Sequence, residues 1–226
     1  MNRPSSIPSW LRVLLVFVLA AGLLLTGCQQ EKTIKIGYVT EQTGVEAYIG
    51  QATVPALQDY IDEVNAAGGV GGYKLQLVAY DTRSEVTDAV SVTKRLIEQD
   101  RVTAVIGPSW SAAAIPMAEI ADTNKVPIIA TTASNVNVTV DEKGELNPFM
   151  FRVCFIDPYQ GFALADYAYN ELGKRKVAFL TDVASPYSVG IQRYFAEHFV
   201  ELGGEVVAEE GYQTGDTEFR AQLAKV

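Results

Sequence analysis

Two clusters of hydroxyl side chains are the residues of this sequence best suited to hold a small ligand. Ser109 and Ser111 follow one short apolar segment, and Thr131, Thr132 and Ser134 follow another. Each apolar segment is short enough for a buried strand of a parallel sheet. Since the carboxyl ends of parallel strands meet at one edge, the two clusters are expected to lie together there, where ligands of α/β proteins bind.

The chemistry that these clusters favour is the binding of a carboxylate. Neutral hydroxyls can hydrogen-bond an anion without burying a countercharge, and the free backbone N–H groups and dipole of a helix start add to this. An alternative is that the serines and threonines only cap helices.

Other chemistries find little support in the sequence. The segment 40–46 has neither of the glycine spacings that cradle phosphates, and the segment 107–111 is not the G-x-S-x-G motif of a hydrolase. The one histidine, His198, lies in the middle of a predicted helix. Two cysteines and one histidine leave little for a metal site. We therefore expect no catalytic residue, no metal, no cofactor and no enzyme activity.

The overall composition is that of a globular protein. Of the 226 residues, 48% are hydrophobic and 20% are charged, which excludes a disordered or collagen-like chain. The formal charge is −9 and there is no basic block, which argues against nucleic acid as a partner.

The N-terminal segment has the features of an export signal. Arg3 and Arg12 precede the segment 13–25, which is apolar but short for a membrane span, and the segment ends in Leu-Thr-Gly before Cys28. This resembles a lipobox, so we expect a signal peptide over 1–27, a diacylated (palmitate-bearing) Cys28 and a linker over 28–32. The protein would then be extracytoplasmic and lipid-anchored to the bacterial cell membrane or outer membrane. The alternative is an uncleaved anchor.

The second cysteine, Cys154, is left without a partner if Cys28 is lipidated, so no internal disulfide is expected. Its setting in the apolar segment 151–156 predicts a buried, unreactive cysteine on a strand.

Predicted strands and helices alternate along the rest of the chain. The predicted strands are 33–39, 73–80, 102–106, 126–130, 176–181 and 205–212. The predicted helices are 47–67, 85–99, 112–123 and 187–202. This alternation indicates parallel βαβ units with right-handed crossovers.

The pattern restarts near residue 176, including a Gly-Gly pair directly before a strand. We therefore predict an α/β protein of two Rossmann-like lobes with parallel sheets: an N-terminal lobe with crossover over 33–150 and a second lobe over 151–226. The segment 131–158 would contain the crossover. The second lobe is expected to be incomplete, because its last predicted helix opens at 217 and has no ending signal before 226, so the chain is interpreted as a fragment.

These features, in this order, resemble the type I periplasmic-binding fold, specifically the leucine/isoleucine/valine-binding-like solute-binding lipoproteins of ABC transporters. The resemblance covers residues 33–226. It is carried by Ile36-Gly37, Thr43-Gly44, Gly68-Gly69-Val70, Tyr80-Asp81, Val105-Ile106-Gly107-Pro108, Phe151-Arg152, Asp157, Gln160-Gly161 and Phe219.

The resemblance implies a set of ligand-binding residues. Ser111 matches the family's serine after the third strand, and Thr132 and Ser134, with Ala133 between them, match its fourth-strand pair. Tyr48 falls near the aromatic wall of the pocket, although Ile49 is an alternative match. Tyr187 matches an aromatic residue of the second lobe, Asp157 matches a crossover aspartate, and Trp110 would line the pocket.

The function implied is capture of an amino acid, branched-chain-like, or a related small amide by hinge closure, followed by delivery to an ABC permease. A monomer is the usual state in this family. The alternative is a receptor ectodomain of the same fold that signals without transport.

Overall fold

The structure is a computed structural model that describes residues 32–141 and 143–226. The predicted signal peptide, most of the linker and Cys28 lie outside the described residues. Residues Thr33–Val226 group together as one structural unit. Within the described part of the chain, no helix has both the length and the apolar character needed to cross a bilayer.

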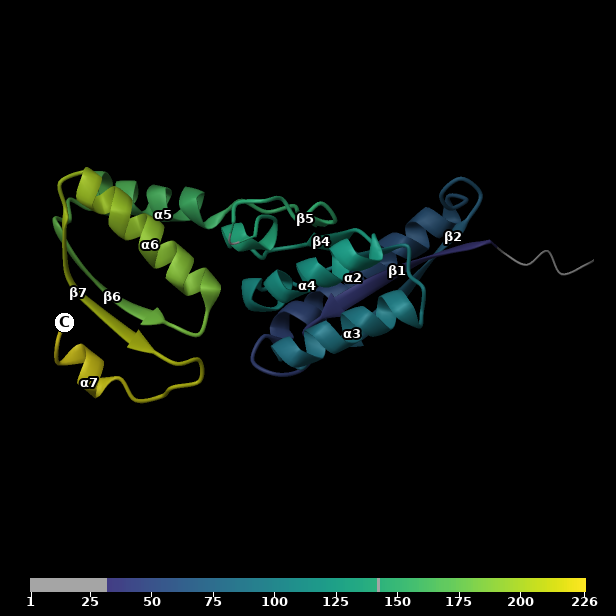
Figure 1. The fold of residues 1–226 in the computed structure, drawn as a ribbon, viewed down its shortest axis with the longest axis horizontal. Helices are drawn as coiled ribbons and strands as arrows, with labels where there is room; N and C mark the ends of the chain where they lie inside the picture. Colours follow the sequence, from purple (N-terminus) through teal and green to yellow (C-terminus); the bar gives the residue numbers. More distant parts are fainter. Residues whose placement is uncertain (1–31, 142) are drawn as a thin grey trace, which may run out of the picture. The chain divides into compact units, whose positions relative to one another are not determined.

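A five-stranded parallel sheet forms the first half of the described chain (Figure 1). Its strands are β1 (Thr33–Thr40), β2 (Lys74–Asp81), β3 (Ala104–Ile106), β4 (Ile128–Ala130) and β5 (Met150–Arg152). They are ordered β2-β1-β3-β4-β5, and every neighbouring pair is parallel. The carboxyl ends of β1, β3 and β4 therefore meet at one edge.

Helices α2 (Ala47–Ala66), α3 (Val86–Glu98) and α4 (Ser111–Asn124) cover this sheet. Val39 of β1 is fully buried in a core that includes Leu96 of α3 and residues of α4. The preceding residue, Tyr38, donates its hydroxyl to Thr53 Oγ1 of α2 at 2.6 Å. Since successive strand residues point to opposite faces, α2 covers one face while α3 and α4 cover the other.

A second parallel sheet pairs β6 (Lys176–Asp182) with β7 (Glu205–Tyr212). Helices α5 (Asp157–Asp166) and α6 (Pro186–Glu201) pack against each other, and Phe179 of β6 meets Phe195 of α6 edge-on at 5.4 Å between ring centroids. A π-helical turn (Tyr167–Glu171) continues α5, and a short helix, α7 (Arg220–Leu223), follows β7. An N-cap bond from Ser188 N–H to Ser185 Oγ fixes the start of α6.

These sheets confirm the predicted α/β class with two parallel sheets. The predicted strands and the four long helices all form, with ends that differ by a few residues. β5 extends the first sheet to Arg152, which is past the predicted lobe boundary between residues 150 and 151.

Two local predictions are corrected by the structure. The segment 151–156 is not one strand, because the strand ends at Arg152 and Cys154 lies in the bend after it. Cys154 is only half-buried, and burial raises the pKa of its thiol. Helix α5 was not predicted, although Asp157-Pro158 places a proline in its first turn, a common helix-start signal.

Candidate ligand-binding site

A cavity of about 520 Å³ lies at the carboxyl edge of the first sheet. Its walls come from the turns after β1, β2, β3 and β4, the segment around Cys154, and the segments directly after β6 and β7. The lining residues are Val45, Glu46, Ile49, Ser84, Ser109, Trp110, Ser111, Ala112, Thr132, Cys154, Phe155, Gln160, Asp182, Ala184, Ser185, Tyr187 and Thr214. Both sheets therefore contribute to one cavity that mixes apolar walls with hydroxyl and carboxylate groups.

Four of the eight predicted ligand-binding residues line this cavity: Trp110, Ser111, Thr132 and Tyr187. The hydroxyl of Thr132 donates to the Ser109 carbonyl at 2.6 Å, which ties the turn after β4 to the turn after β3. Tyr187 donates its hydroxyl to Gln160 Oε1 at 3.1 Å on the opposite wall. The structure thus brings the two predicted hydroxyl clusters together.

Tyr48 does not line the cavity. Its side chain is 69% exposed, whereas the adjacent Ile49 is among the lining residues. Consecutive helix residues are about 100° apart around the axis, so the two side chains point in different directions. Ile49, the alternative match in the sequence, is the residue that occupies the wall.

The remaining predicted residues, Ala133, Ser134 and Asp157, are buried and are not among the lining residues. The Asn135 amide connects this layer to the second half of the chain, since its Nδ2 donates to Asp157 Oδ2 at 3.0 Å and to the Pro186 carbonyl at 2.8 Å. Asn135 also donates its backbone N–H to Ser111 Oγ at 3.2 Å. Ser134 and Asp157 therefore lie in a buried layer that adjoins the cavity residue Ser111.

Burial raises the pKa of the Asp157 carboxyl, while the hydrogen bond from Asn135 and the positive charge of Arg152 oppose this shift. A buried carboxyl is shielded from solvent, and when it accepts a hydrogen bond from an amide it links the two segments that carry these groups. In this arrangement, Asp157 is part of the connection between the two sheets.

Helix α4 begins at the cavity, and the N–H groups of its first turn have no side-chain cap. Its N-cap residue is Trp110, and no side chain caps the helix. The serines around it are engaged elsewhere: Ser109 donates to Glu41, and Ser111 accepts from Asn135. The alternative that these serines only cap the helix is therefore wrong for α4. The start of α4, with Trp110, Ser111 and Ala112, lines the cavity, and the first N–H groups of a helix without a side-chain cap can bind an anion.

Several lining residues were missed by sequence reasoning, among them Asp182 and Thr214. Asp182, the last residue of β6, accepts a hydrogen bond from Oγ1 of Thr214, which follows β7. In the first sheet the roles are exchanged, because Asp81, the last residue of β2, accepts a hydrogen bond at 2.6 Å from Oγ1 of Thr43, which follows β1. The repeat of the sequence pattern therefore does not mark the pair that lines the cavity.

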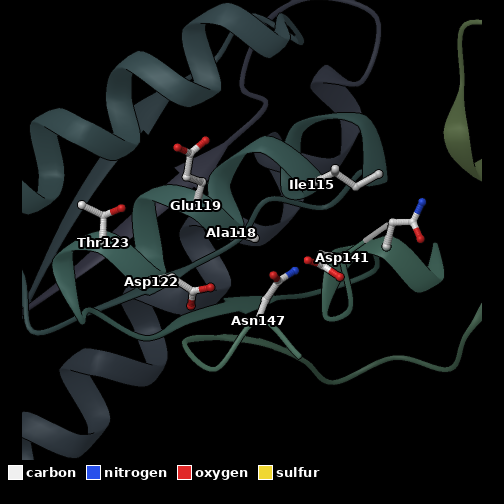
Figure 2. A pocket seen from close by; sticks show the side chains of 8 residues that line it. Ile115, Ala118, Glu119, Asp122, Thr123, Asp141 and Asn147 are labelled. Carbon is white, nitrogen blue, oxygen red and sulfur yellow. The ribbon is translucent and has the colours of Figure 1, made fainter. Parts of the chain in front are cut away.

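A second cavity, of about 470 Å³, lies beside α4 and carries three carboxylates: Glu119, Asp122 and Asp141 (Figure 2). Asp122 Oδ1 accepts the backbone N–H of Phe149 at 2.9 Å. Asp141 Oδ1 accepts the backbone N–H groups of Lys143 and Glu145, each at 2.8 Å. Two of the three carboxylates therefore stabilise the loop before β5. Among the described residues, no three His, Cys, Asp or Glu side chains are placed so that they could hold a metal ion together.

Comparison with known proteins identifies the family. Residues 33–226 match the family described as periplasmic binding protein. The chain belongs to this family. It is also 34% identical over 193 residues to a Pseudomonas aeruginosa protein named amino acid binding protein, a match that covers 85% of this chain and 50% of that protein.

Two solved periplasmic binding proteins show the same fold. The LivJ substrate-binding protein of a branched-chain amino acid transporter from Streptococcus pneumoniae, in complex with isoleucine, is 38% identical with a TM-score of 0.77 and covers 86% of this chain and 54% of its own. A solute-binding protein of an ABC transporter from Rhodopseudomonas palustris, in complex with 3,4-dihydroxybenzoic acid, is 27% identical with a TM-score of 0.74 and covers 86% and 51%.

The resemblance stated from the sequence is therefore confirmed. The chain spans about half the length of the relatives that it matches. The matched family is a solute-binding family and not a class of enzymes, and its periplasmic character agrees with an extracytoplasmic location.

Proposed function

We propose that this periplasmic binding protein is the solute-binding component of an ABC importer, and that it captures an amino acid, branched-chain-like, or a related small amide by hinge closure. The observation that carries the proposal is the cavity lined by residues from both lobes, with Ser111 at the start of α4, which no side chain caps, and Thr132 in the turn after β4. A carboxylate at that helix start would accept hydrogen bonds from the backbone N–H groups and from the Ser111 hydroxyl. The ligands of the relatives, isoleucine and dihydroxybenzoate, both carry a carboxylate.

The ligand's other end would meet the apolar and aromatic wall. Ile49, Trp110 and Phe155 supply apolar surface, and Tyr187 approaches from α6. Closure of the second lobe would bury the ligand between these groups, so that affinity depends on the free-energy difference between open and closed states.

Titration calorimetry of the full-length protein with the branched-chain amino acids tests this proposal. We expect Ser111→Ala and Thr132→Ala each to weaken binding by about 1 to 3 kcal/mol, because each removes a hydroxyl that would pair with a buried polar group of the ligand. The matched control is Ser91→Ala on α3, an exposed serine that bonds only within its helix, and it should leave affinity unchanged. Unchanged affinity in both cavity variants would contradict the site.

The anchoring of the protein is a separate part of the proposal. Cys28 would carry the lipid, hold the protein outside the cytoplasm at the cell membrane or outer membrane, and leave a monomeric binding body near its permease. Stable anchoring needs more than one acyl chain. Labelling cells with a palmitate analogue should mark the wild-type protein and not Cys28→Ser, while Cys154→Ser should keep the label. A label retained by Cys28→Ser would contradict the anchor.

A further inference from the structure

The Glu41 carboxyl is buried next to the cavity, directly after the end of β1. The residue is 1% exposed, and its backbone carbonyl accepts the N–H of Gly50 of α2 at 3.2 Å. Its side-chain Oε2 accepts the hydroxyl of Ser109 at 2.8 Å, while the buried Oε1 has no hydrogen-bond partner among the described residues. Burying a carboxyl oxygen without a hydrogen-bond partner costs folding free energy, so such a group in a native structure often has a functional role.

Glu41 reaches the cavity through Ser109. Ser109 is a lining residue, and its carbonyl accepts the hydroxyl of Thr132, another lining residue. Ser109 therefore contacts Glu41 through its hydroxyl and Thr132 through its backbone carbonyl. Because Ser109 itself lines the cavity, a change in how Glu41 bonds to its hydroxyl changes a polar group of the cavity wall.

The direction of the Ser109 hydrogen bond depends on the proton of Glu41. An ionised carboxylate only accepts, so Ser109 must then give its hydroxyl proton to Glu41 and can offer only oxygen lone pairs to a ligand. A protonated carboxyl can donate to Ser109 instead, which frees the Ser109 proton for the cavity. We propose that Glu41 is a positioning residue that sets the hydrogen-bond polarity of Ser109, so that ionised Glu41 makes the cavity select a ligand with an ammonium or amide N–H group.

The charges around Glu41 fix the sign of this effect. Burial raises the pKa of Glu41, the hydrogen bond from Ser109 opposes this, and the charge of Glu46 adds to it. Asp81 accepts from the backbone of the adjacent Gln42, Arg83 is paired with Asp88, and Asp182 lines the cavity from the other sheet. A ligand ammonium stabilises the ionised form of Glu41, so affinity for an amine-bearing ligand rises as the pH rises through the folded pKa.

This inference rests on the proposed function. Calorimetry on the full-length protein tests the inference by comparing two ligands, L-isoleucine and 3-methylpentanoate. The second ligand has the same carbon skeleton and carboxylate as isoleucine but lacks the amine. We expect isoleucine to bind about tenfold more tightly at about pH 8 than at about pH 5, because the ionised Glu41 adds one charge-assisted hydrogen bond. Glu41→Gln and Ser109→Ala should abolish this pH dependence. Glu119→Gln, a carboxylate at the second cavity, should keep it. An equal rise for 3-methylpentanoate, or a wild-type pH profile in Glu41→Gln, would overturn the inference.

A second measurement does not depend on any ligand. Infrared titration of the ligand-free protein should show the carbonyl band of a protonated carboxyl that is absent in Glu41→Gln and shifted in Ser109→Ala, because Ser109 is its hydrogen-bond partner. A band that Ser109→Ala leaves in place overturns the inference whatever binds. Absence of isoleucine binding together with a shifted band would instead count against the proposed amino-acid function alone.

Discussion

Arg152→Met is expected to lower the free energy of unfolding by about 2 to 4 kcal/mol. Arg152, the last residue of β5, donates Nη1 to the carbonyls of Ala133 and Asn135 at 3.3 and 2.7 Å. Its Nη2 donates to the Val136 carbonyl at 3.2 Å and to Thr139 Oγ1 at 2.6 Å. Methionine fills similar space but leaves these acceptors without their donor.

The effect should extend beyond the lost bonds, because the segment held by Arg152 carries Asn135. That amide contacts both Asp157 and Pro186, so a loosened segment weakens the connection between the two sheets. Urea unfolding followed by circular dichroism measures the change. Arg152→Lys should recover only part of the stability, since an ammonium cannot match the planar fork of a guanidinium.

The control for this prediction is Arg193→Met on α6. Arg193 is exposed and pairs with Glu197 one turn away at 2.9 Å, an arrangement that contributes little. Its urea midpoint should match that of the wild type. If Arg152→Met and Arg193→Met unfold at the same midpoint, the role given to Arg152 is wrong.

Gly161→Ala is expected to destabilise the protein by about 2 to 3 kcal/mol, the cost of overpacking a close contact. Gly161 lies in α5 where the helix crosses α6. A Cβ at this position would come within 2.6 Å of Tyr194 Cβ and 2.8 Å of the Phe195 backbone nitrogen. Backbone atoms of a helix cannot yield as a flexible side chain does, so α5 and α6 would have to move apart.

The sign of this effect distinguishes packing from helix propensity. Alanine is favoured over glycine by about 1 kcal/mol within a helix, so propensity alone would make Gly161→Ala stabilising. The matched control is Ala163→Gly at an exposed position of the same helix, which should cost about 0.5 to 1 kcal/mol. Thermal unfolding of both variants measures the packing cost at Gly161 and the helix propensity at Ala163. If Gly161→Ala is more stable than the wild type, α5 and α6 are not in close contact at this position.

The consequence for function is that both residues hold segments that adjoin the cavity. Arg152 fixes the segment that carries Asn135, and Gly161 lets α5 and α6 pack closely enough for α6 to present Tyr187. In the proposed importer component, binding would therefore weaken in both variants even though neither residue lines the cavity.

The sequence alone determined the alternation of strands and helices and the edge at which the hydroxyl clusters gather. Both depend on local patterns: a buried strand of a parallel sheet is a continuous apolar segment, and the residues directly after it must lie at the carboxyl edge. Ser111 and Thr132 were found in this way. The repeat of the pattern after residue 176 likewise predicted a second parallel sheet.

Only the tertiary structure decided which neighbours of these residues reach the cavity. Ile49 rather than Tyr48 faces it, Ser134 and Asp157 are buried, and Cys154 lies on the wall instead of on a strand. Glu41 gains its partner from Ser109, 68 positions away. Helix rotation and contacts between distant segments depend on how whole elements pack, and no local pattern of residues contains that information.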